Sequence, residues 1–169
     1  MSTLYNTLRS EPYSLAVTTL SLDDLYLTHA DQVALAQAHP SNPLLQHRGQ
    51  PSTHDLSLGE QVFASLAAER PTAIPQYDKS AFQGQGDRVP REQWEVVNDG
   101  EGKPTVKVVI FEGWCVGFRA LDEQTLRQKW EDAVRKKEAG GYRGRLGYVK
   151  FEDVRAVNEA LRRYDTLTE

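Results

Sequence analysis

The pattern of hydrophobic positions is organised around a short apolar run at residues 106–113, VKVVIFEG. Residues 108–111 are β-branched or aromatic without a break, and the run stops at Glu112. Such a run predicts a strand buried on both faces, as in a parallel sheet covered by helices. Ligands bind in these sheets at the carboxyl ends of the strands, which is where Glu112 stands. The alternative is that Glu112 only caps the turn after the strand.

A second strand is predicted at residues 13–20, YSLAVTTL, and it also leads directly into acids, Asp23 and Asp24. The sequence between the two strands predicts helices, so the strands form a crossover unit and run parallel. If they are neighbours, their ends lie about 5 Å apart. Asp23 or Asp24 then faces Glu112 across one crevice.

Helix-start signals divide the remaining sequence. Thr28 and Ser57 each begin a capping box, with an acid three residues later. Asp122 is suited to cap a third helix, and residues 2–10 have the spacing of the last turns of another. The predicted helices are therefore the segments 2–10, 28–38, 57–70, 122–134 and 151–164.

Two loop-rich stretches hold most of the candidate polar side chains. Residues 40–56 contain three prolines, and residues 71–105 form the longest irregular region, with one short strand predicted near 74–77. A loop this long inside a compact domain is usually functional or disordered. The density of charged side chains favours function here. The candidates are Arg48, His54 and Asp55 in the first stretch, and Tyr77, Asp78, Lys79, Asp87 and Arg88 in the second.

Composition narrows the class of protein. The net charge of −4 argues against nucleic-acid or membrane-surface binding, which needs a basic field. No apolar run approaches the roughly 20 residues that span a bilayer. Cys115 is the single cysteine, so an internal disulfide is excluded, and its apolar neighbours predict a small buried side chain. No secretory signal is present, and we expect a cytoplasmic protein. The basic segment 135–147 follows no strand, which predicts a solvated connection rather than a phosphate-binding loop.

Carboxylates gathered at one crevice need a compensating charge, because like charges repel and raise each other's pKa. A hard divalent cation with oxygen ligands supplies it, and Mg²⁺ on a phosphate-bearing substrate is the common case. Arg48, Lys79 and Arg88 would complete an anion site. A carboxylate pair could instead serve glycoside hydrolysis, but that function leaves the three cations without a role.

Four blocks of sequence resemble consecutive motifs of the D-glycerate 3-kinase family, which includes fungal ATP-dependent kinases. They are LSLDDLYLT (20–28), NPLLQHRGQPSTHD (42–55), PQYDKSAFQGQGDR (75–88) and VVIFEGWCVGF (108–118). Each is weak alone, but together they are specific because they occur in family order. The resemblance implies an α/β fold of the P-loop NTPase type, a parallel sheet flanked by helices. It also implies transfer of the ATP γ-phosphoryl group to a hydroxyl of glycerate or a similar small acid, with Mg²⁺ and ATP as cofactors.

The resemblance also implies roles for particular residues. Asp23 matches the acid that orients and deprotonates the acceptor hydroxyl, and it can contact Mg²⁺ through water. Glu112 matches the Walker-B acid, which acts on Mg²⁺ directly or through water. The positions that match the acceptor pocket are Asp24, Tyr26, Arg48, His54, Asp55, Tyr77, Lys79 and Arg88. For these the alternative is a surface or loop-bracing interaction.

One departure from the family pattern is large. The phosphate-binding pattern G-x-x-x-x-G-K-[ST] does not occur in the 169 residues. We therefore expect residues 1–169 to form a single partial kinase domain truncated at both ends, lacking the first strand and the Walker A loop. Residues 15–120 would be its family-like core and residues 121–169 its helical part. Such a chain would be inactive alone. The alternative is a non-catalytic remnant that binds a small acid or another protein.

Overall fold

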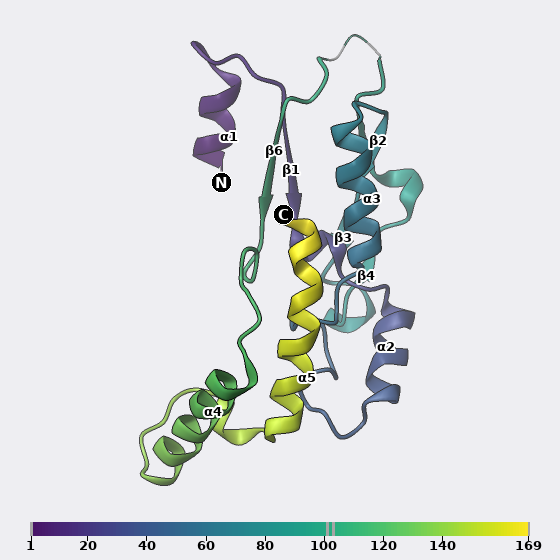
Figure 1. Cartoon of the computed structure of the whole chain (residues 1–169). Coiled ribbons are helices and arrows are strands. Elements are labelled where there is room, and N and C mark those ends of the chain that lie inside the picture. The colour runs from purple at the N-terminus through teal and green to yellow at the C-terminus, as the bar shows by residue number, and fades with distance from the viewer. Residues whose placement is uncertain (1, 101, 103, 169) are drawn as a thin grey trace.

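The computed structural model describes residues 2–100, 102 and 104–168, and these form a mixed α/β fold (Figure 1). The helices are α1 (Ser2–Arg9), α2 (His29–Ala38), α3 (Leu56–Ala67), α4 (Glu123–Glu138) and α5 (Phe151–Leu161). The strands are β1 (Val17–Ser21), β2 (Thr72–Ile74), β3 (Tyr77–Asp78), β4 (Asp87–Arg88), β5 (Glu95–Val97) and β6 (Val108–Glu112). Short 3-10 helices include η1 (Leu22–Leu25), η2 (Phe82–Gly84), η3 (Arg91–Gln93), η4 (Leu146–Tyr148) and η5 (Arg162–Leu167).

The two strands predicted to run side by side do so. β1 and β6 are paired in parallel, with Val17 opposite Val108 and Ser21 opposite Glu112 (Figure 1). The predicted parallel pairing is therefore confirmed. Because β1 runs straight into η1, Asp23 and Asp24 follow the strand end that lies beside Glu112.

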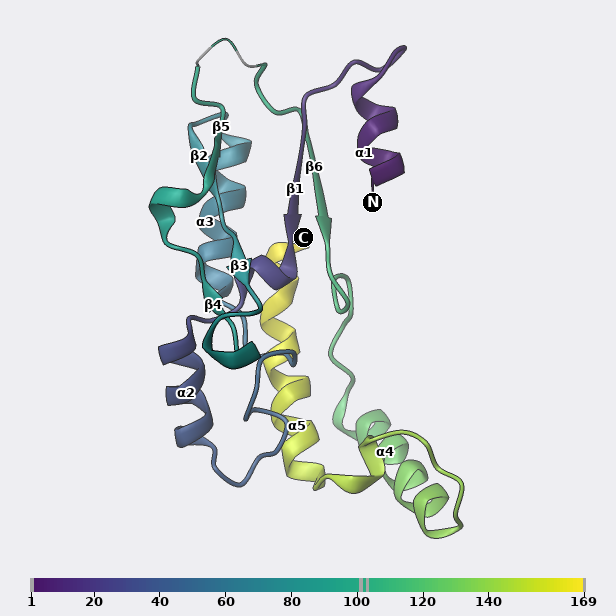
Figure 2. The same ribbon diagram turned by 180° about the vertical axis from the view of Figure 1, so that it is seen from behind.

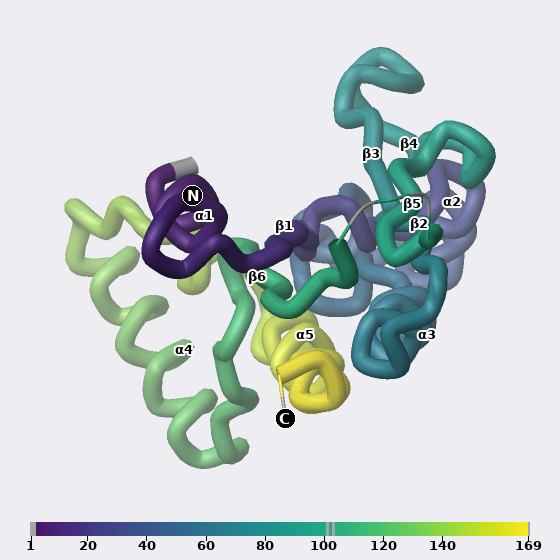
Figure 3. Tube along the Cα trace, turned by 90° about the horizontal axis from the view of Figure 1, so that it is seen from above, coloured from purple at the N-terminus to yellow at the C-terminus, as the bar shows by residue number. Residues whose placement is uncertain are grey.

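The burial of β6 differs from the prediction. Each of its five residues is half-buried rather than enclosed on both faces. On one side Phe111 packs edge-on against Phe63 of α3, with ring centroids 5.1 Å apart. Viewed from above, α1 and α3 lie on opposite sides of the strand pair (Figure 3). Within the described residues β6 pairs with β1 alone, and this limited cover leaves it partly exposed.

The segment 72–97 contains more strands than predicted. β2 pairs antiparallel with β5, and β3 pairs antiparallel with β4. The sequence predicts one short strand near residues 74–77, in a position that spans the observed β2 and the start of β3. β4 and β5 were missed because two- or three-residue strands carry no detectable alternation.

The hydrophobic core is centred on η1, at the carboxyl end of the parallel strand β1. Leu20, Leu22 and Leu25 are almost completely buried, and Tyr164 and Leu167 reach the same cluster from η5. The predicted burial of Cys115 is confirmed, since its side chain is 1% exposed. Packing around η1 fixes the segment that carries Asp23 and Asp24, so the core directly supports the candidate acids.

Two of the three predicted helix caps are confirmed and one is wrong. The Thr28 side chain accepts the Asp31 N–H at the start of α2, and Asp122 accepts the Thr125 N–H at the start of α4. The cap of α3 is Asp55 rather than Ser57, because its carboxylate accepts the Leu58 N–H at 3.0 Å. The Asp55 N–H donates to the Leu25 carbonyl at 2.7 Å, and this bond starts α3 earlier than the capping box predicts.

The last third of the chain forms an arm and a return helix. α4 extends away from the strand pair, and α5 runs back toward the ends of the strands (Figures 1 and 2). The segment predicted as a solvated connection, residues 135–147, begins inside α4 and leads to η4. In the described part of the chain no helix combines the length and hydropathy needed to cross a bilayer.

Candidate functional site

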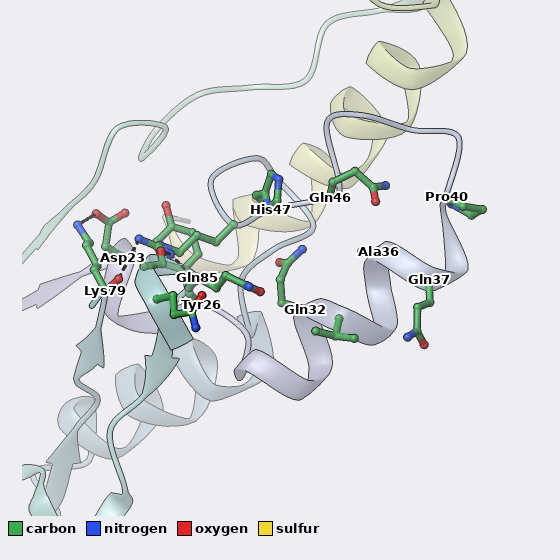
Figure 4. A pocket seen from close by; sticks show the side chains of 14 residues that line it. Asp23, Tyr26, Gln32, Ala36, Gln37, Pro40, Gln46, His47, Lys79 and Gln85 are labelled. Atoms are coloured by element: carbon green, nitrogen blue, oxygen red, sulfur yellow. Dashed lines mark hydrogen bonds and ion pairs between the residues drawn. The ribbon is translucent and has the colours of Figure 1, made fainter. Parts of the chain in front are cut away.

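A cleft of about 720 Å³ opens beside η1. It lies between α2, the loop of residues 40–48 and the loop of residues 79–85 (Figure 4). Asp23 and Lys79 stand at one end, and α2 forms a wall. The lining residues are Asp23, Tyr26, Gln32, Val33, Ala36, Gln37, Pro40, Gln46, His47, Arg48, Lys79, Gln83, Gly84 and Gln85.

Asp23 is held as a carboxylate in this cleft. Its Oδ2 accepts from Lys79 Nζ at 2.6 Å, and the Ser21 hydroxyl accepts its backbone N–H (Figure 4). Partial burial raises the pKa of Asp23, but the hydrogen bonds from Lys79 and Tyr26, together with the charge of Lys79, outweigh it. The pKa is lowered overall, so Asp23 is ionised near neutral pH and can accept a proton or a hydrogen bond.

Asp24 and Glu112 share the electrostatic environment of Asp23. The Asp24 carboxylate accepts the Tyr77 N–H at 3.1 Å. Burial, followed by the negative charges of Asp23 and Glu112, raises the pKa of Asp24 above its usual value. Glu112 therefore lies within electrostatic reach, although it is not among the residues that line the cleft.

These acids suit a hard cation only in part. Within the described residues no group of three or more His, Cys, Asp or Glu side chains is arranged to hold a metal ion. The negative charges of Asp23 and Glu112 nevertheless disfavour ionisation of Asp24, and a bound divalent cation would offset this repulsion. Mg²⁺ usually keeps several waters and takes one or two carboxylates plus substrate phosphates. The carboxylates present fit a site of this kind, in which water and substrate phosphate complete the coordination, rather than a site made of protein ligands alone.

Aromatic side chains stack behind Asp23. The His54 ring lies parallel to Tyr26, with centroids 4.4 Å apart, and Tyr77 meets Tyr26 edge-on at 5.4 Å. Burial lowers the pKa of His54 to about 4, so the ring is neutral near pH 7. Burial also raises the pKa of the Tyr26 hydroxyl, which bonds to Asp23. His54 and Tyr77 do not line the cleft; they support residues that do.

Asp55 and Arg88 bind each other. Arg88 Nη1 donates to Asp55 Oδ2 at 3.2 Å, and Nη2 donates to the Tyr26 carbonyl at 2.8 Å. Asp55 also caps α3. This arrangement is the loop brace that the sequence left open as an alternative. A direct substrate role for either residue stays a prediction.

Arg48 lines the cleft but is already bonded to the opposite wall. Its guanidinium donates to the carbonyls of Gly84 (2.7 Å) and Gln85, and it lies over the Tyr77 ring at 5.8 Å. Arg48 therefore holds the loop of residues 79–85 in place and adds positive charge beside the cleft.

Four of the ten predicted site residues line the cleft, namely Asp23, Tyr26, Arg48 and Lys79. Sequence reasoning missed the wall formed by α2 and the loops, which includes Gln32, His47 and Gln85. Gln32 is 8% exposed, and its amide donates to the Leu45 carbonyl at 3.0 Å. A polar side chain on the inward face of a capped helix was the available signal.

The fold of this chain is similar to about half of each of two solved structures. A structure of D-glycerate 3-kinase from Cryptococcus neoformans var. grubii has a TM-score of 0.83 and 38% identity, covering 98% of this chain and 55% of its own. The YGR205w protein has a TM-score of 0.70 and 32% identity, covering 98% of this chain and 50% of its own. No family model matches the chain.

Curated proteins that are similar in sequence are also named as kinases. "Uncharacterized kinase mug58" of Schizosaccharomyces pombe is 48% identical over 109 residues, 63% of this chain and 38% of the relative. "Probable ATP-dependent kinase TDA10" of Saccharomyces cerevisiae is 41% identical, over 60% of this chain and 34% of the relative. The chloroplastic D-glycerate 3-kinase of Arabidopsis thaliana is 36% identical, over 64% of this chain and 24% of the relative.

The chain is therefore homologous to D-glycerate 3-kinase and to fungal kinases over 60–64% of its length. It spans between 24% and 38% of the length of these curated relatives. The family resemblance predicted from the four sequence blocks is confirmed.

Proposed function

We propose that this chain carries the acceptor-binding part of an ATP-dependent small-molecule kinase of the D-glycerate 3-kinase type. The acceptor would be a hydroxyl of glycerate or of a similar small acid. The observation that carries this proposal is the parallel pairing of β1 and β6 in a chain homologous to such kinases, because it puts the strand end that leads into Asp23 opposite Glu112.

Each side chain has a definite task under this proposal. Asp23 is ionised and is positioned to accept the proton of the attacking hydroxyl, a role typically worth 10²–10⁴-fold in rate. Lys79, 58% exposed at its side chain, can leave Asp23 and pair with the carboxylate of the acceptor. Arg48 adds a second positive charge beside the cleft.

Mg²⁺ and ATP belong to the proposal through the related kinases. Glu112 and Asp23 would hold the cation, directly or through water, and the cation would neutralise charge on the transferred phosphoryl group. The 169 residues contain no G-x-x-x-x-G-K-[ST] pattern to cradle a triphosphate. We therefore infer that this polypeptide forms a single partial P-loop-type domain, which binds the acceptor without transferring phosphate by itself.

The test is calorimetric titration of the 169-residue chain with D-glycerate, followed by a panel of other small hydroxy acids. Saturable binding of at least one acid, weakened about tenfold or more by Lys79→Met, is the expected result, since a lost charge-assisted bond costs about 1.5–3 kcal/mol. Lys107→Met is the matched control, because Lys107 forms a similarly exposed ion pair with Glu69 at 2.5 Å, outside the cleft. No binding by any acid of the panel, or equal loss in both variants, would reject the acceptor site.

The rival function is a non-catalytic binding module. A supported transcript that starts at Met1 would favour the module, whereas an in-frame phosphate-binding pattern upstream would favour the enzyme. In an extended enzyme, Asp23→Asn should reduce turnover by orders of magnitude and leave nucleotide binding nearly intact. Unchanged turnover would remove Asp23 from its proposed role.

A further inference from the structure

The Tyr164 hydroxyl joins the C-terminal 3-10 helix to the site. Tyr164 is 5% exposed and lies in η5. Its oxygen accepts the Ser52 N–H at 3.2 Å and lies 2.7 Å from His54 Nδ1. The two rings meet edge-on, with centroids 5.5 Å apart. The contact spans 110 positions of sequence, so it is a tertiary feature rather than a local turn.

Proton counting fixes the direction of the bond between Tyr164 and His54. If Nδ1–H donated to the tyrosine, the buried Tyr164 O–H would have no acceptor and the His54 Nε2 lone pair would have no donor. If Tyr164 donates to Nδ1, every polar atom of Tyr164 is satisfied, and the proton of His54 resides on Nε2. His54 Nε2 has no partner among the described residues in either case. The second arrangement leaves fewer buried groups unpaired and is favoured for that reason.

The fixed ring of His54 in turn orients Tyr26. The two rings are stacked at an interplanar angle of 21°, and their segments are joined by an antiparallel bridge. The Tyr26 hydroxyl lies close enough to Asp23 for each group to affect the pKa of the other. The hydrogen bond between Tyr164 and His54 and the stacking of His54 on Tyr26 thus lead from η5 to a residue that lines the cleft beside Asp23.

We propose that Tyr164 is a positioning residue of this site, whose hydroxyl holds His54 as the neutral Nε2–H tautomer and thereby orients Tyr26 toward Asp23. This inference rests on the proposed function, because Asp23 is the proposed base. His54 then supports Tyr26, with its Nε2–H group unpaired among the described residues, and does not act as a second base. Loss of a single hydroxyl at Tyr164 acts on Asp23 through two intervening side chains.

The experiment records the imidazole ¹⁵N shifts of His54 and the side-chain carboxyl ¹³C shift of Asp23 in the 169-residue chain near neutral pH. In the wild-type chain the Nδ1 resonance is expected to be that of an unprotonated nitrogen and Nε2 that of a protonated one. Tyr164→Phe keeps the ring but removes the hydroxyl. It should mix the two tautomers and shift the Asp23 carboxyl signal, while the thermal midpoint reports any general loss of packing.

Tyr148→Phe is the matched control, since Tyr148 is 65% exposed and lies in η4. It should leave both signals at their wild-type positions. An Nδ1–H tautomer in the wild-type chain would overturn the inference without any variant. So would a Tyr164→Phe chain whose Asp23 signal is unchanged. Neither readout involves a ligand, so a failed D-glycerate titration and a failed tautomer assignment are separate outcomes.

Discussion

Lys79 Nζ lies 2.6 Å from Asp23 Oδ2, and this ion pair closes one end of the cleft (Figure 4). The Lys79 side chain is 58% exposed and that of Asp23 is 29% exposed. An exposed cation on a flexible stem can exchange partners readily, whereas Asp23 is fixed by η1 and by Tyr26. The pair keeps the acid ionised and offers its cation to an incoming anion.

Replacing Lys79 should therefore raise the pKa of Asp23. In Lys79→Met the hydrogen bond and the positive charge are lost, while the burial that opposes ionisation remains. We expect the carboxyl ¹³C titration of Asp23 to move to higher pH. Lys107→Met, which removes the cation paired with Glu69, should leave that titration unchanged. A titration that stays at its wild-type midpoint in Lys79→Met would show that Lys79 does not lower the pKa of Asp23.

The parallel pairing of the strands that lead into Asp23 and Glu112 could be predicted because each acid follows an apolar strand pattern. A parallel pair with an intervening helix has few possible topologies, so two correct strand assignments put both strand ends at the same edge. Tyr164 was predictable as a buried position of a helical stripe. Its contact with His54 was not, because hydrogen bonds between distant segments leave no periodic trace in the sequence.

The burial of β6 and the cap of α3 show where local patterns fail. The apolar run of β6 indicates a preference for burial, but the exposed fraction of a strand depends on which elements pack against each of its faces. Ser57 had the spacing of a cap, yet Asp55 was selected by its bonds to Leu25 and Arg88. The wall of the cleft was missed for the same reason, since loops meet α2 through contacts such as His29 with Gln85 at 3.1 Å.

Asp55 should contribute more to stability than a simple helix cap. Asp55→Ala removes the acceptor of the Leu58 N–H and leaves the largely buried Arg88 guanidinium without its carboxylate. Loss of an N-cap costs about 1 kcal/mol, and an unpaired buried polar group adds about 1–3 kcal/mol. We expect a decrease of about 2–4 kcal/mol in the free energy of unfolding, measured with urea.

Asp122→Ala is the matched comparison for Asp55. Asp122 caps α4 through the Thr125 N–H at 2.9 Å and is exposed. Its loss should remove only the cap and should therefore lower the free energy of unfolding less than Asp55→Ala does. Equal effects of the two substitutions would indicate that Arg88 contributes nothing through Asp55. Asp55→Asn, which keeps a cap acceptor but loses the charge, should fall between them.

Buried His54 should make the chain less stable in mild acid. Burial lowers its folded-state pKa from 6.5 to about 4. Between these values the unfolded chain binds a proton that the folded chain does not. The free energy of unfolding is therefore fully retained above pH 6.5 and falls as the pH is lowered toward 4. The total loss is on the order of 3 kcal/mol.

Urea unfolding between pH 7.5 and 4, with pH as the only variable, measures this dependence. His54→Gln should flatten the profile in that window, even if its stability at pH 7 is lower. His39→Gln, at an exposed position, should retain the wild-type slope. If His54→Gln and the wild-type chain lose stability in parallel, other groups carry the acid sensitivity.

Mg·ATP should bind this polypeptide weakly. Tight binding of a triphosphate by P-loop kinases depends on backbone N–H groups and a lysine of the pattern G-x-x-x-x-G-K-[ST], which the 169 residues do not contain. Calorimetric titration with Mg·ATP is expected to give no low-micromolar binding. A saturable low-micromolar isotherm, abolished by Glu112→Gln but not by Glu95→Gln, would contradict this prediction and identify a different nucleotide site.

Gly113 allows a close approach between the end of β6 and η1. It directly follows Glu112, and a Cβ placed there would lie 2.5 Å from Leu22 Cβ, the residue before Asp23. A Cβ cannot rotate away, so Gly113→Ala must push η1 from β6. Strain of this kind typically costs 1–3 kcal/mol. We expect that loss in urea unfolding, together with a shift of the Asp23 carboxyl signal.

Gly117→Ala separates displacement from backbone strain. Gly117 has a φ of +79°, which disfavours alanine, but a Cβ there meets no atom within 4 Å. Its substitution should lower stability through the backbone and leave the Asp23 signal in place. If Gly113→Ala also lowers stability without moving that signal, then η1 is held by the core alone. In that case the spacing of Asp23 and Glu112 does not depend on the contact between Gly113 and Leu22.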